Sequence, residues 1–233
     1  MNTAERINEI ASKISLQSYL EVGVQEGITF NNIHNIPHKI GVDPFFRFEY
    51  KKYETEKVKF FETTSDNFFQ NNKTKFDIIF IDGLHEYKQT LRDFINALEF
   101  SQEKTIIIID DVYPNDIYSS LVGKNLDSDY CYSLRSHFHP ESRDGRWHGD
   151  VYKAIAFIHD FYPNITMHTI SDNYGNPQTI CYRKYRSNYK PQFNSLESIE
   201  RLTYFDMIED TRFYCVTTEE DALASAVKYL KHF

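Results

Sequence analysis

The stretch Tyr19-Leu-Glu-Val-Gly-Val-Gln-Glu-Gly27 decides the fold of this chain, because it joins an apolar run to a pair of glycines. The run Ser18–Val22 predicts a buried strand, and Gly27–His34 has the period of a helix. Gly23 and Gly27 let the backbone turn sharply and approach a ligand without a Cβ in the way. The N–H groups at the start of the following helix point at the same place. The stretch therefore predicts a ligand-binding turn, although an ordinary strand-to-helix turn is the alternative.

Apolar runs and helical segments alternate from this turn to residue 110. Runs of four to six residues that are rich in Ile, Val and Phe fit strands buried on both faces, as in a parallel sheet. Alternation of this kind predicts right-handed crossovers and a doubly wound α/β sheet with helices on both faces. The further strands are expected at Lys39–Val42, Val58–Phe61, Phe76–Ile81 and Thr105–Ile109, and the helices between them at Phe45–Tyr53, Ser65–Asn71 and His85–Phe100.

The second half of the chain is less regular. Residues 112–146 hold Pro, Gly, Asn, Asp and Ser without a clear period, which predicts a long functional or mobile loop. A helix at Asp150–Phe161 and two late strands, joined by a turn over residues 171–177, complete a mostly parallel, seven-stranded, Rossmann-like sheet. We expect one domain over residues 1–183 and a helical extension over residues 184–233 packed on it. The late strands are Ile165–Ile170 and Gln178–Arg183, and the last helix is Glu219–His232.

Composition and charge restrict the classes of partner. The net charge is -8, and no cluster of Lys and Arg is visible, which argues against nucleic acid and anionic membranes as partners. No stretch approaches the roughly 18 apolar residues of a membrane span, and the first residues lack the apolar run of a signal peptide. Cys131, Cys181 and Cys215 form no zinc pattern, so reduced thiols in a cytoplasmic protein are expected.

Asp43 follows the second expected strand in the sequence Gly41-Val-Asp-Pro44. In a parallel sheet this position lies at the carboxyl edge, where ligands bind, and a carboxylate there can accept both hydroxyls of a ribose. The spacing of Gly23 and Gly27 is not GxGxxG, so a dinucleotide pyrophosphate site fits poorly. A helix cap or an Asx turn before Pro44 is the alternative role for Asp43.

Three aspartates are expected at the carboxyl ends of adjacent strands. Asp82 follows the fourth strand, and Asp110-Asp111 follow the fifth. Carboxylates that converge on one crevice repel each other unless a cation or a proton lies between them. Hard oxygen ligands suit Mg²⁺, Ca²⁺ or Mn²⁺, and such an ion can hold a substrate diol and lower the pKa of a hydroxyl. Capping of a turn by Asp110 or Asp111 is the alternative.

These residues together resemble the class I S-adenosylmethionine (SAM)-dependent methyltransferases. The stretch from Glu21 to Gly27 is similar to the first motif of that family, and Asp43 is similar to its ribose-binding acid. The resemblance implies that residues 1–183 form a methyltransferase domain with SAM as cofactor. Asp82 then contacts the methionine end of SAM, and Ser65 and Asp66 lie where the fold contacts adenine, unless they only cap a helix. The implied cofactor-binding residues are Glu21, Gly23, Gln25, Gly27, Asp43, Ser65, Asp66 and Asp82.

Three motifs narrow this resemblance to the macrocin-type and surface-polysaccharide sugar O-methyltransferases. They are Ile81-Asp-Gly-Leu-His-Glu-Tyr87, Asp110-Asp111 and Gly149-Asp-Val-Tyr-Lys-Ala-Ile155. The resemblance implies a Mg²⁺ ion held by Asp82, Asp110 and Asp111, and a carbohydrate acceptor.

One position departs from the pattern. Such relatives place an acidic base two residues after the strand-four aspartate, where this chain has Leu84. We therefore expect His85, one residue on, to be the catalytic base, with an apparent pKa of about 6.5, and Asp111 is the other candidate for this role. A buried structural histidine is the alternative.

We expect methyl transfer from SAM to an oxygen, rather than a nitrogen, of a sugar or other natural-product acceptor, as in capsule or polysaccharide biosynthesis. The expected partner is then a small-molecule or carbohydrate substrate. The sequence does not determine whether the chain also forms a homo-oligomer. An NAD-dependent oxidoreductase on a similar sheet and a non-catalytic SAM-binding protein are the alternatives. Charged and aromatic groups on the 112–149 segment are candidates for a lid that holds a sugar or a phosphorylated substrate, and a solvated loop is the alternative: His137, His139, Arg143, Arg146, Trp147 and His148.

Overall fold

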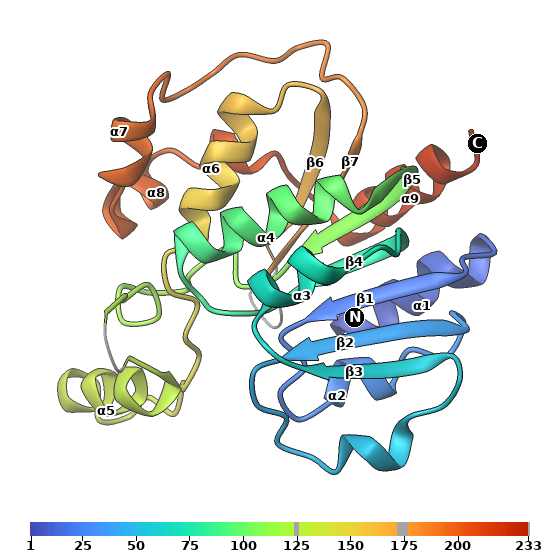
Figure 1. Ribbon diagram of the computed structural model, residues 1–233. Coiled ribbons are helices and arrows are strands. Elements are labelled where there is room, and N and C mark those ends of the chain that lie inside the picture. Colours follow the sequence, from blue (N-terminus) through green and yellow to red (C-terminus); the bar gives the residue numbers. More distant parts are fainter. Residues whose placement is uncertain (124–125, 172–176, 233) are drawn as a thin grey trace.

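The computed structural model describes residues 1–123, 126–171 and 177–232. Within these residues the chain forms an eight-stranded sheet in the order β3-β2-β1-β4-β5-β7-β6-β8, with helices on both faces (Figure 1). The doubly wound, mostly parallel α/β fold is confirmed. The strands are β1 (Ser18–Val22), β2 (His38–Asp43), β3 (Val58–Glu62), β4 (Phe76–Ile81), β5 (Ser101–Ile109), β6 (Ile165–Ile170), β7 (Gln178–Arg183) and β8 (Val216–Thr217).

The number of strands differs from the expected seven. The additional strand, β8, pairs in parallel with the end of β6. It is two residues long, too short for any hydrophobic period to appear in the sequence. The helices are α1 (Thr3–Lys13), α2 (Ile28–Asn31), α3 (Ser65–Asn71), α4 (Tyr87–Glu99), α5 (Ser128–Phe138), α6 (Tyr152–Phe161), α7 (Leu196–Glu200), α8 (Tyr204–Glu209) and α9 (Glu219–Leu230), with 3-10 turns η1 (Tyr50–Tyr53) and η2 (Arg212–Tyr214).

The order in which the strands are added to the sheet reverses between β1 and β4. From β1 the sheet grows outward through β2 and β3 on one side, and β4 and β5 extend it on the other, all in parallel. The antiparallel β7 then inserts between β5 and β6. Ligands of open α/β sheets bind outside the carboxyl ends of the strands at such a switch point. The ends of β1 and β4 are therefore where a cofactor site belongs.

Apolar side chains cover both faces of the central strands, as the continuous runs predicted. Along β1, Leu20 belongs to the core under α4 and α6, while Tyr19 belongs to the core under α1, α2 and α9. Both side chains are fully buried. Because helices pack on both faces of these strands, the strand ends that carry the site are rigidly placed.

Two expected elements are wrong. Of the expected helix Phe45–Tyr53, only the 3-10 turn η1 forms. Here Phe46 and Tyr50 pack their rings on Phe60 of β3 instead of following a helical period. The segment expected as a loop over residues 112–146 contains α5, which Asp127 caps by accepting a hydrogen bond from the backbone of Tyr130.

The C-terminal residues pack on the same sheet as the rest of the chain. Helix α9 contacts α1 and the strands β5, β6 and β7, so the expected extension is helical but also supplies β8. Fully buried Arg6 of α1 donates to Gln178 of β7 at 2.9 Å, and the Gln178 amide donates to Asp110 at 3.2 Å. A domain boundary at residue 183 stays a prediction. Most of the turn that was expected between β6 and β7, residues 172–176, lies outside the described residues.

None of the described helices has both the length and the apolar character of a membrane span.

Candidate active site

Four residues selected from the sequence lie along one edge of the sheet, as expected. The edge continues the strand ladder: Gly23 N–H donates to the Val42 carbonyl at 2.9 Å, and Asp82 N–H donates to the Val22 carbonyl at 2.8 Å. Asp110 N–H donates to the Ile81 carbonyl at 3.0 Å in the same way. The carboxyl edge of β2, β1, β4 and β5 therefore carries Asp43, Gly23, Asp82 and Asp110 in that order.

The glycine turn leaves no room for side chains. Gly23 has a φ of +90°, and a Cβ there would lie 1.8 Å from the carbonyl oxygen of Asp82. Gly27 has a φ of +75° and is the N-cap of α2. A Cβ on Gly27 would lie 2.7 Å from the Asn31 side chain. Positive φ and close backbone approach are both conditions that glycine meets at little cost. The turn thus brings bare backbone to the switch point beside Asp82.

Asp43 ties two loops together at the carboxyl edge. One carboxylate oxygen accepts from Gln25 N–H at 2.8 Å, and the other accepts from Phe45 N–H at 2.8 Å. The first bond fixes Gln25 in a left-handed conformation with φ +46°. Each carboxylate oxygen has a second lone pair, so these bonds leave acceptor capacity for another donor.

Glu21 is buried at 1% exposure rather than open to the edge. It accepts a hydrogen bond from the Tyr19 hydroxyl at 2.5 Å. Burial raises the pKa of Glu21 to about 8, against the lowering effect of the Tyr19 hydrogen bond. A carboxyl with this pKa is mostly protonated at neutral pH.

Ser65 and Asp66 lie in the first turn of α3, but Thr64 is the residue that caps the helix. The Gln89 amide of α4 donates to Ser65 Oγ at 3.1 Å and to Asp66 Oδ1 at 3.4 Å. Both residues therefore fasten α3 to α4. Capping and adenine contact are the two roles that the sequence predicts for these residues, and the structure adds this third one.

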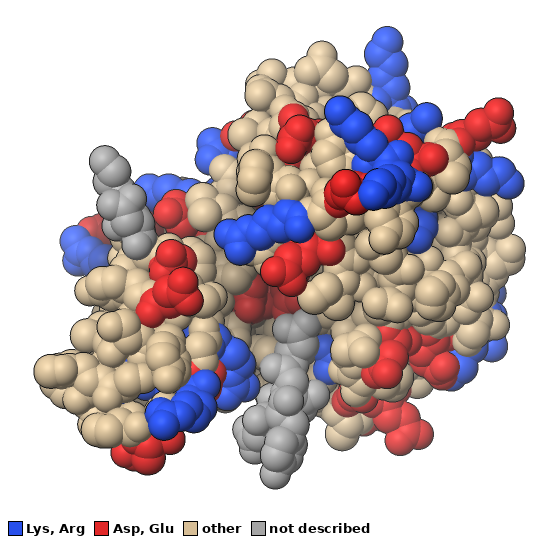
Figure 2. Space-filling view, turned by 90° about the horizontal axis from the view of Figure 1, so that it is seen from below, with Lys and Arg blue, Asp and Glu red and all other residues tan. Residues whose placement is uncertain are grey.

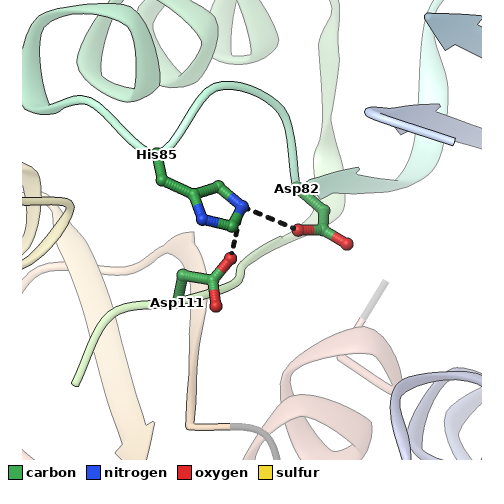
Figure 3. A group of neighbouring side chains, drawn as sticks. All are labelled: Asp82, His85 and Asp111. Atoms are coloured by element: carbon green, nitrogen blue, oxygen red, sulfur yellow. Dashed lines mark ion pairs between the residues drawn. The ribbon is translucent and has the colours of Figure 1, made fainter. Parts of the chain in front are cut away.

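One group of metal-ligating side chains gathers within the described residues: Asp82, His85 and Asp111, whose ligand atoms all lie within 4.8 Å of one another (Figure 3). His85 Nε2 lies 2.8 Å from Asp111 Oδ2 and 3.9 Å from Asp82 Oδ1. The side chains come from the β4–α4 loop and from the end of β5. They are partly exposed, at 22% for His85, 30% for Asp82 and 14% for Asp111.

Asp110 is not part of this group. It is buried, with one oxygen accepting from Asp111 N–H at 2.9 Å and the other accepting from the Gln178 amide. Asp111 has a left-handed φ of +57°, a conformation that aspartate tolerates better than most residues. This turn directs neighbouring carboxylates to different partners. The expected set of three aspartates is thus replaced by two aspartates and a histidine.

The charges of the group depend on one another. Burial lowers the pKa of His85, but the Asp111 carboxylate outweighs burial and raises that pKa from 6.5 to about 9. Burial alone would raise the pKa of Asp111, but the nearby imidazole lowers it below its usual value. Burial and the other carboxylates raise the pKa of Asp82 well above its usual value. The group therefore favours a positive charge, and the raised pKa of His85 departs from the expected value of about 6.5.

Residues 112–123 and 126–149 form a folded lobe that reaches His85. The lobe is held together by buried Arg135, which pairs with Asp116 at 2.6 Å. The Trp147 carbonyl lies 2.8 Å from His85 Nδ1, and the two rings are 4.8 Å apart. Because a carbonyl only accepts, Nδ1 is the donor, and Nε2 is the nitrogen turned toward Asp111. His148 Nε2 lies 3.8 Å from the other oxygen of Asp111.

The expected lid residues of this lobe fall into two sets. Trp147 and His148 lie at the group just described, as these contacts show. Arg146 instead pairs with Asp144 at 2.7 Å, and Arg143 donates to carbonyls of its own loop. His137 and His139 are exposed on the lobe. The Trp147 carbonyl is a site atom that sequence reasoning missed, and the following motif, residues 149–155, was the available signal.

Charges on the face that Figure 2 shows are mixed. Lys and Arg side chains alternate with Asp and Glu, and acidic side chains lie at the back of the hollow between the lobe and the main body. Phosphate backbones bind to clustered cations. The absence of nucleic acid partners stays a prediction, and the mixed charge of this face is compatible with it.

Comparison with known proteins shows what this chain is similar to. Residues 20–112 match the model of a family described as a methyltransferase domain. No curated protein sequence matches the chain. The Podospora anserina methyltransferase PaMTH1, solved with S-adenosylhomocysteine (SAH) bound, has a TM-score of 0.53 at 15% identity over 78% of this chain and 77% of its own.

Two further solved structures have the same fold. The plantazolicin methyltransferase BpumL in complex with SAH has a TM-score of 0.54 at 13% identity, over 78% of this chain and 82% of its own. An O-methyltransferase family protein from Burkholderia thailandensis has a TM-score of 0.51 at 15% identity, over 78% of this chain and 55% of its own. Residues 20–112 thus match a methyltransferase domain on a fold that solved methyltransferases share.

Proposed function

We propose that this SAM-dependent methyltransferase transfers the methyl group of SAM to an oxygen atom of a small-molecule or carbohydrate acceptor. The observation that carries the proposal is the Asp82–His85–Asp111 group beside the glycine turn, at the switch point of the sheet. The sulfonium methyl is already activated, so the enzyme needs mainly to align donor and acceptor and to remove a proton from the acceptor. An imidazole held between two carboxylates suits the second task.

The donor is proposed to lie along the edge from Asp43 to Asp82. The turn at Gly23 and Gly27 offers close backbone approach, and the free lone pairs of Asp43 suit the ribose hydroxyls. Gln25 lies in the same turn, and Ser65 and Asp66 lie beyond the next strand, where an adenine ring would reach. Glu21, being buried, would act by supporting the turn from beneath.

Asp43→Ala is expected to weaken SAH binding by about 1.5–3 kcal/mol, the range for hydrogen bonds to a charged group. The reason is twofold, because the variant loses the ribose acceptors and also the bond that fixes Gln25. Calorimetry with SAH measures the effect. Asp43→Asn, which retains one acceptor oxygen, serves as the graded control. Unchanged affinity in a folded Asp43→Ala protein would place the ribose elsewhere.

The proton route follows from the tautomer that Trp147 imposes. The acceptor oxygen attacks the methyl carbon, the carbon–sulfur bond breaks and SAH leaves. The hydroxyl proton passes to His85 Nε2, and Asp111 stabilises the imidazolium that forms. Before each turnover His85 must be neutral, which its raised pKa opposes at low pH.

The acceptor is proposed to be a hydroxyl compound of the sugar or natural-product kind, as in capsule or polysaccharide biosynthesis. The support is the placement of the lobe, whose Trp147 and His148 border the reacting group. Aromatic rings and imidazoles of this kind can pack on and bind a hydroxylated ring. The test is a panel of sugar nucleotides, free sugars and phenols incubated with methyl-labelled SAM, read by mass spectrometry. Labelled amines and no labelled hydroxyls would instead indicate N-methylation.

Trp147 also separates the methyltransferase from the oxidoreductase alternative. It is the only tryptophan of the chain and lies beside His85. Its fluorescence should respond to SAM or SAH and not to NADH. A fluorescence response to NADH, with none to SAM or SAH, would indicate that the donor site binds a nicotinamide cofactor instead.

A divalent cation is a second candidate partner of the same group. Two carboxylates and an imidazole form a donor set that fits Mg²⁺ or Mn²⁺, with Trp147 orienting the imidazole from its far side. The raised pKa of Asp82 reflects crowded negative charge that a cation would relieve. When bound, the cation would supply orientation of the acceptor oxygens and a lower pKa of the acceptor hydroxyl. Asp82, His85 and Asp111 would hold it, in place of the expected Asp82, Asp110 and Asp111.

If a cation takes part, treatment with a chelator is expected to abolish methyl transfer while SAH affinity stays unchanged. The donor contacts proposed for Asp43 and the glycine turn lie apart from the group. Methyl transfer before and after chelation, with Mg²⁺ added back, is compared with SAH calorimetry on the same samples. Full activity in chelator would remove the cation from the proposal and leave His85 as a simple base.

A further inference from the structure

Gly149 and Asp150 make contacts that the proposed methyl-transfer chemistry does not involve. Together with Trp147 and His148 it forms a four-residue segment, the 147–150 segment, that runs past the β4–α4 loop. Three consecutive contacts join the two: Trp147 O accepts from His85 Nδ1 at 2.8 Å, Gly149 packs on the His85 carbonyl, and Asp150 Oδ1 accepts from Tyr87 N–H at 2.6 Å. The segment therefore contacts the ring of His85, the backbone of His85 and the backbone of Tyr87, two residues further along the chain.

Asp150 acts as the cap of α4 although it lies far away in the sequence. The residue at the N-cap position, Glu86, makes no capping bond with its side chain. Asp150 supplies the acceptor instead, to the N–H of Tyr87, the first residue of the helix. A carboxylate is favourable there because the helix dipole is positive at its N-terminus. The cap fixes the point at which the loop carrying Asp82 and His85 ends.

Gly149 allows the segment to come this close. Its φ is +58°, and a Cβ would lie 1.7 Å from the carbonyl oxygen of His85. The backbone is held in this place from the other side, because His148 N–H and Gly149 N–H both donate to the Ser119 carbonyl, at 2.8 and 2.9 Å. Ser119 belongs to the lobe, so the lobe and the loop of His85 are joined through this glycine.

We propose that Asp150 is a positioning residue of the methyl-transfer site: it caps α4 from outside and so holds the His85 imidazole in its bond to the Trp147 carbonyl. The inference rests on the proposed function, which assigns the proton-accepting role to His85. Asp150 itself does not touch the reacting atoms. It acts through Tyr87 N–H and the 147–150 segment on the ring of His85.

The test follows the His85 ring directly. In the nitrogen-15-labelled protein, the Nδ1–H of His85 is assigned as the imidazole signal that His85→Ala removes, and its exchange with water is measured. In Asp150→Ala this exchange should be at least about fivefold faster, the factor by which the loss of a helix cap shifts a local opening equilibrium. Asp150→Asn, which retains the Oδ1 acceptor, should keep the slow exchange. Lys153→Ala is the matched control, because it removes the other partner of Asp150 and leaves the cap intact.

Methyl transfer and SAH calorimetry complete the test. On the best acceptor of the panel, Asp150→Ala should lower kcat about tenfold or more and leave the KM for SAM and the SAH affinity unchanged, with Asp150→Asn restoring the rate. Unchanged Nδ1–H exchange in a folded Asp150→Ala protein overturns the inference. Should Asp150→Ala not fold, Asp150→Glu, which displaces the oxygens by one methylene, must show the faster exchange, and slow exchange there overturns it equally. Full methyl transfer by His85→Ala would instead contradict the proposed function, while the exchange rates still decide whether Asp150 positions the ring.

Discussion

Replacing His85 with alanine is expected to lower kcat for methyl transfer by roughly 10²–10⁴-fold, the usual contribution of a positioned base. The side chain is held at Nδ1 by Trp147 and presents Nε2 to Asp111, so its removal takes away the acceptor of the substrate proton. SAH affinity should stay close to that of the wild type, since the donor contacts lie on the other side of the switch point. Rate measurements under saturating SAM and calorimetry with SAH give both values.

The pH dependence of the wild type tests the same assignment. His85 accepts a proton only when it is neutral, and its pKa is raised to about 9 by Asp111 against the opposing effect of burial. The rate should therefore rise about tenfold per pH unit below that value and level off above it. A cation bound at Nε2 would take the place of that proton, so a profile that levels off near neutral pH with Mg²⁺ would indicate a cation in the group.

His38→Ala is the control for His85→Ala, because His38 is exposed and lies at the amino end of β2, the opposite edge of the sheet. It should leave kcat and the pH profile unchanged. A His85→Ala enzyme with wild-type kcat would remove the base from the proposed function. In that case the acceptor proton would pass directly to water.

Gly23→Ala is expected to weaken SAH binding by at least about tenfold and to lower the free energy of unfolding by about 1–3 kcal/mol. Alanine adopts a φ of +90° only under strain, and its Cβ would lie 1.8 Å from the Asp82 carbonyl oxygen. The strands β1 and β4 would have to separate at their carboxyl ends, which displaces the turn and Asp82 together. Calorimetry with SAH and urea denaturation measure the two effects.

Gly145→Ala provides a matched control for this substitution. A Cβ at Gly145 meets no described atom within 4 Å, so the same chemical change should alter neither quantity by more than about 0.5 kcal/mol. A Gly23→Ala protein with normal SAH affinity would show that the donor does not approach this backbone. A stability loss without a binding loss would lead to the same conclusion.

The strands and the glycine turn could be predicted because their cause is local. Runs such as Phe76–Ile81 are apolar throughout, since both faces of the central strands are buried, and the structure has these strands at the expected positions. Gly23 and Gly27 were identifiable because their conformations tolerate few other residues. The expected helix at Phe45–Tyr53 was wrong because packing of aromatic rings on Phe60 outweighs its weak helical period.

The arrangement of side chains at the edge could be predicted only in part. Asp110 and Asp111 are neighbours of the same residue type, and the sequence does not tell which one turns toward His85. That choice depends on the left-handed φ of Asp111 and on the amide of Gln178, a residue of the neighbouring strand β7 that lies far away in the sequence. The Trp147 carbonyl had no signature of its own, because every residue carries a backbone carbonyl, and only the motif that follows it at residues 149–155 marked this part of the chain. Its contact with His85 depends on the fold of the whole lobe.

The bonds from Arg6 through Gln178 to Asp110 have a consequence for the order in which the protein matures. They join the first helix, the fifth strand and an inserted strand that is synthesised much later. Contacts between such distant segments form slowly, because a long loop of chain must close first. We expect a nascent chain that has left the ribosome only as far as β5 to pair its parallel strands while Asp110 still lacks its Gln178 partner. The gain of activity is therefore expected to trail the gain of secondary structure.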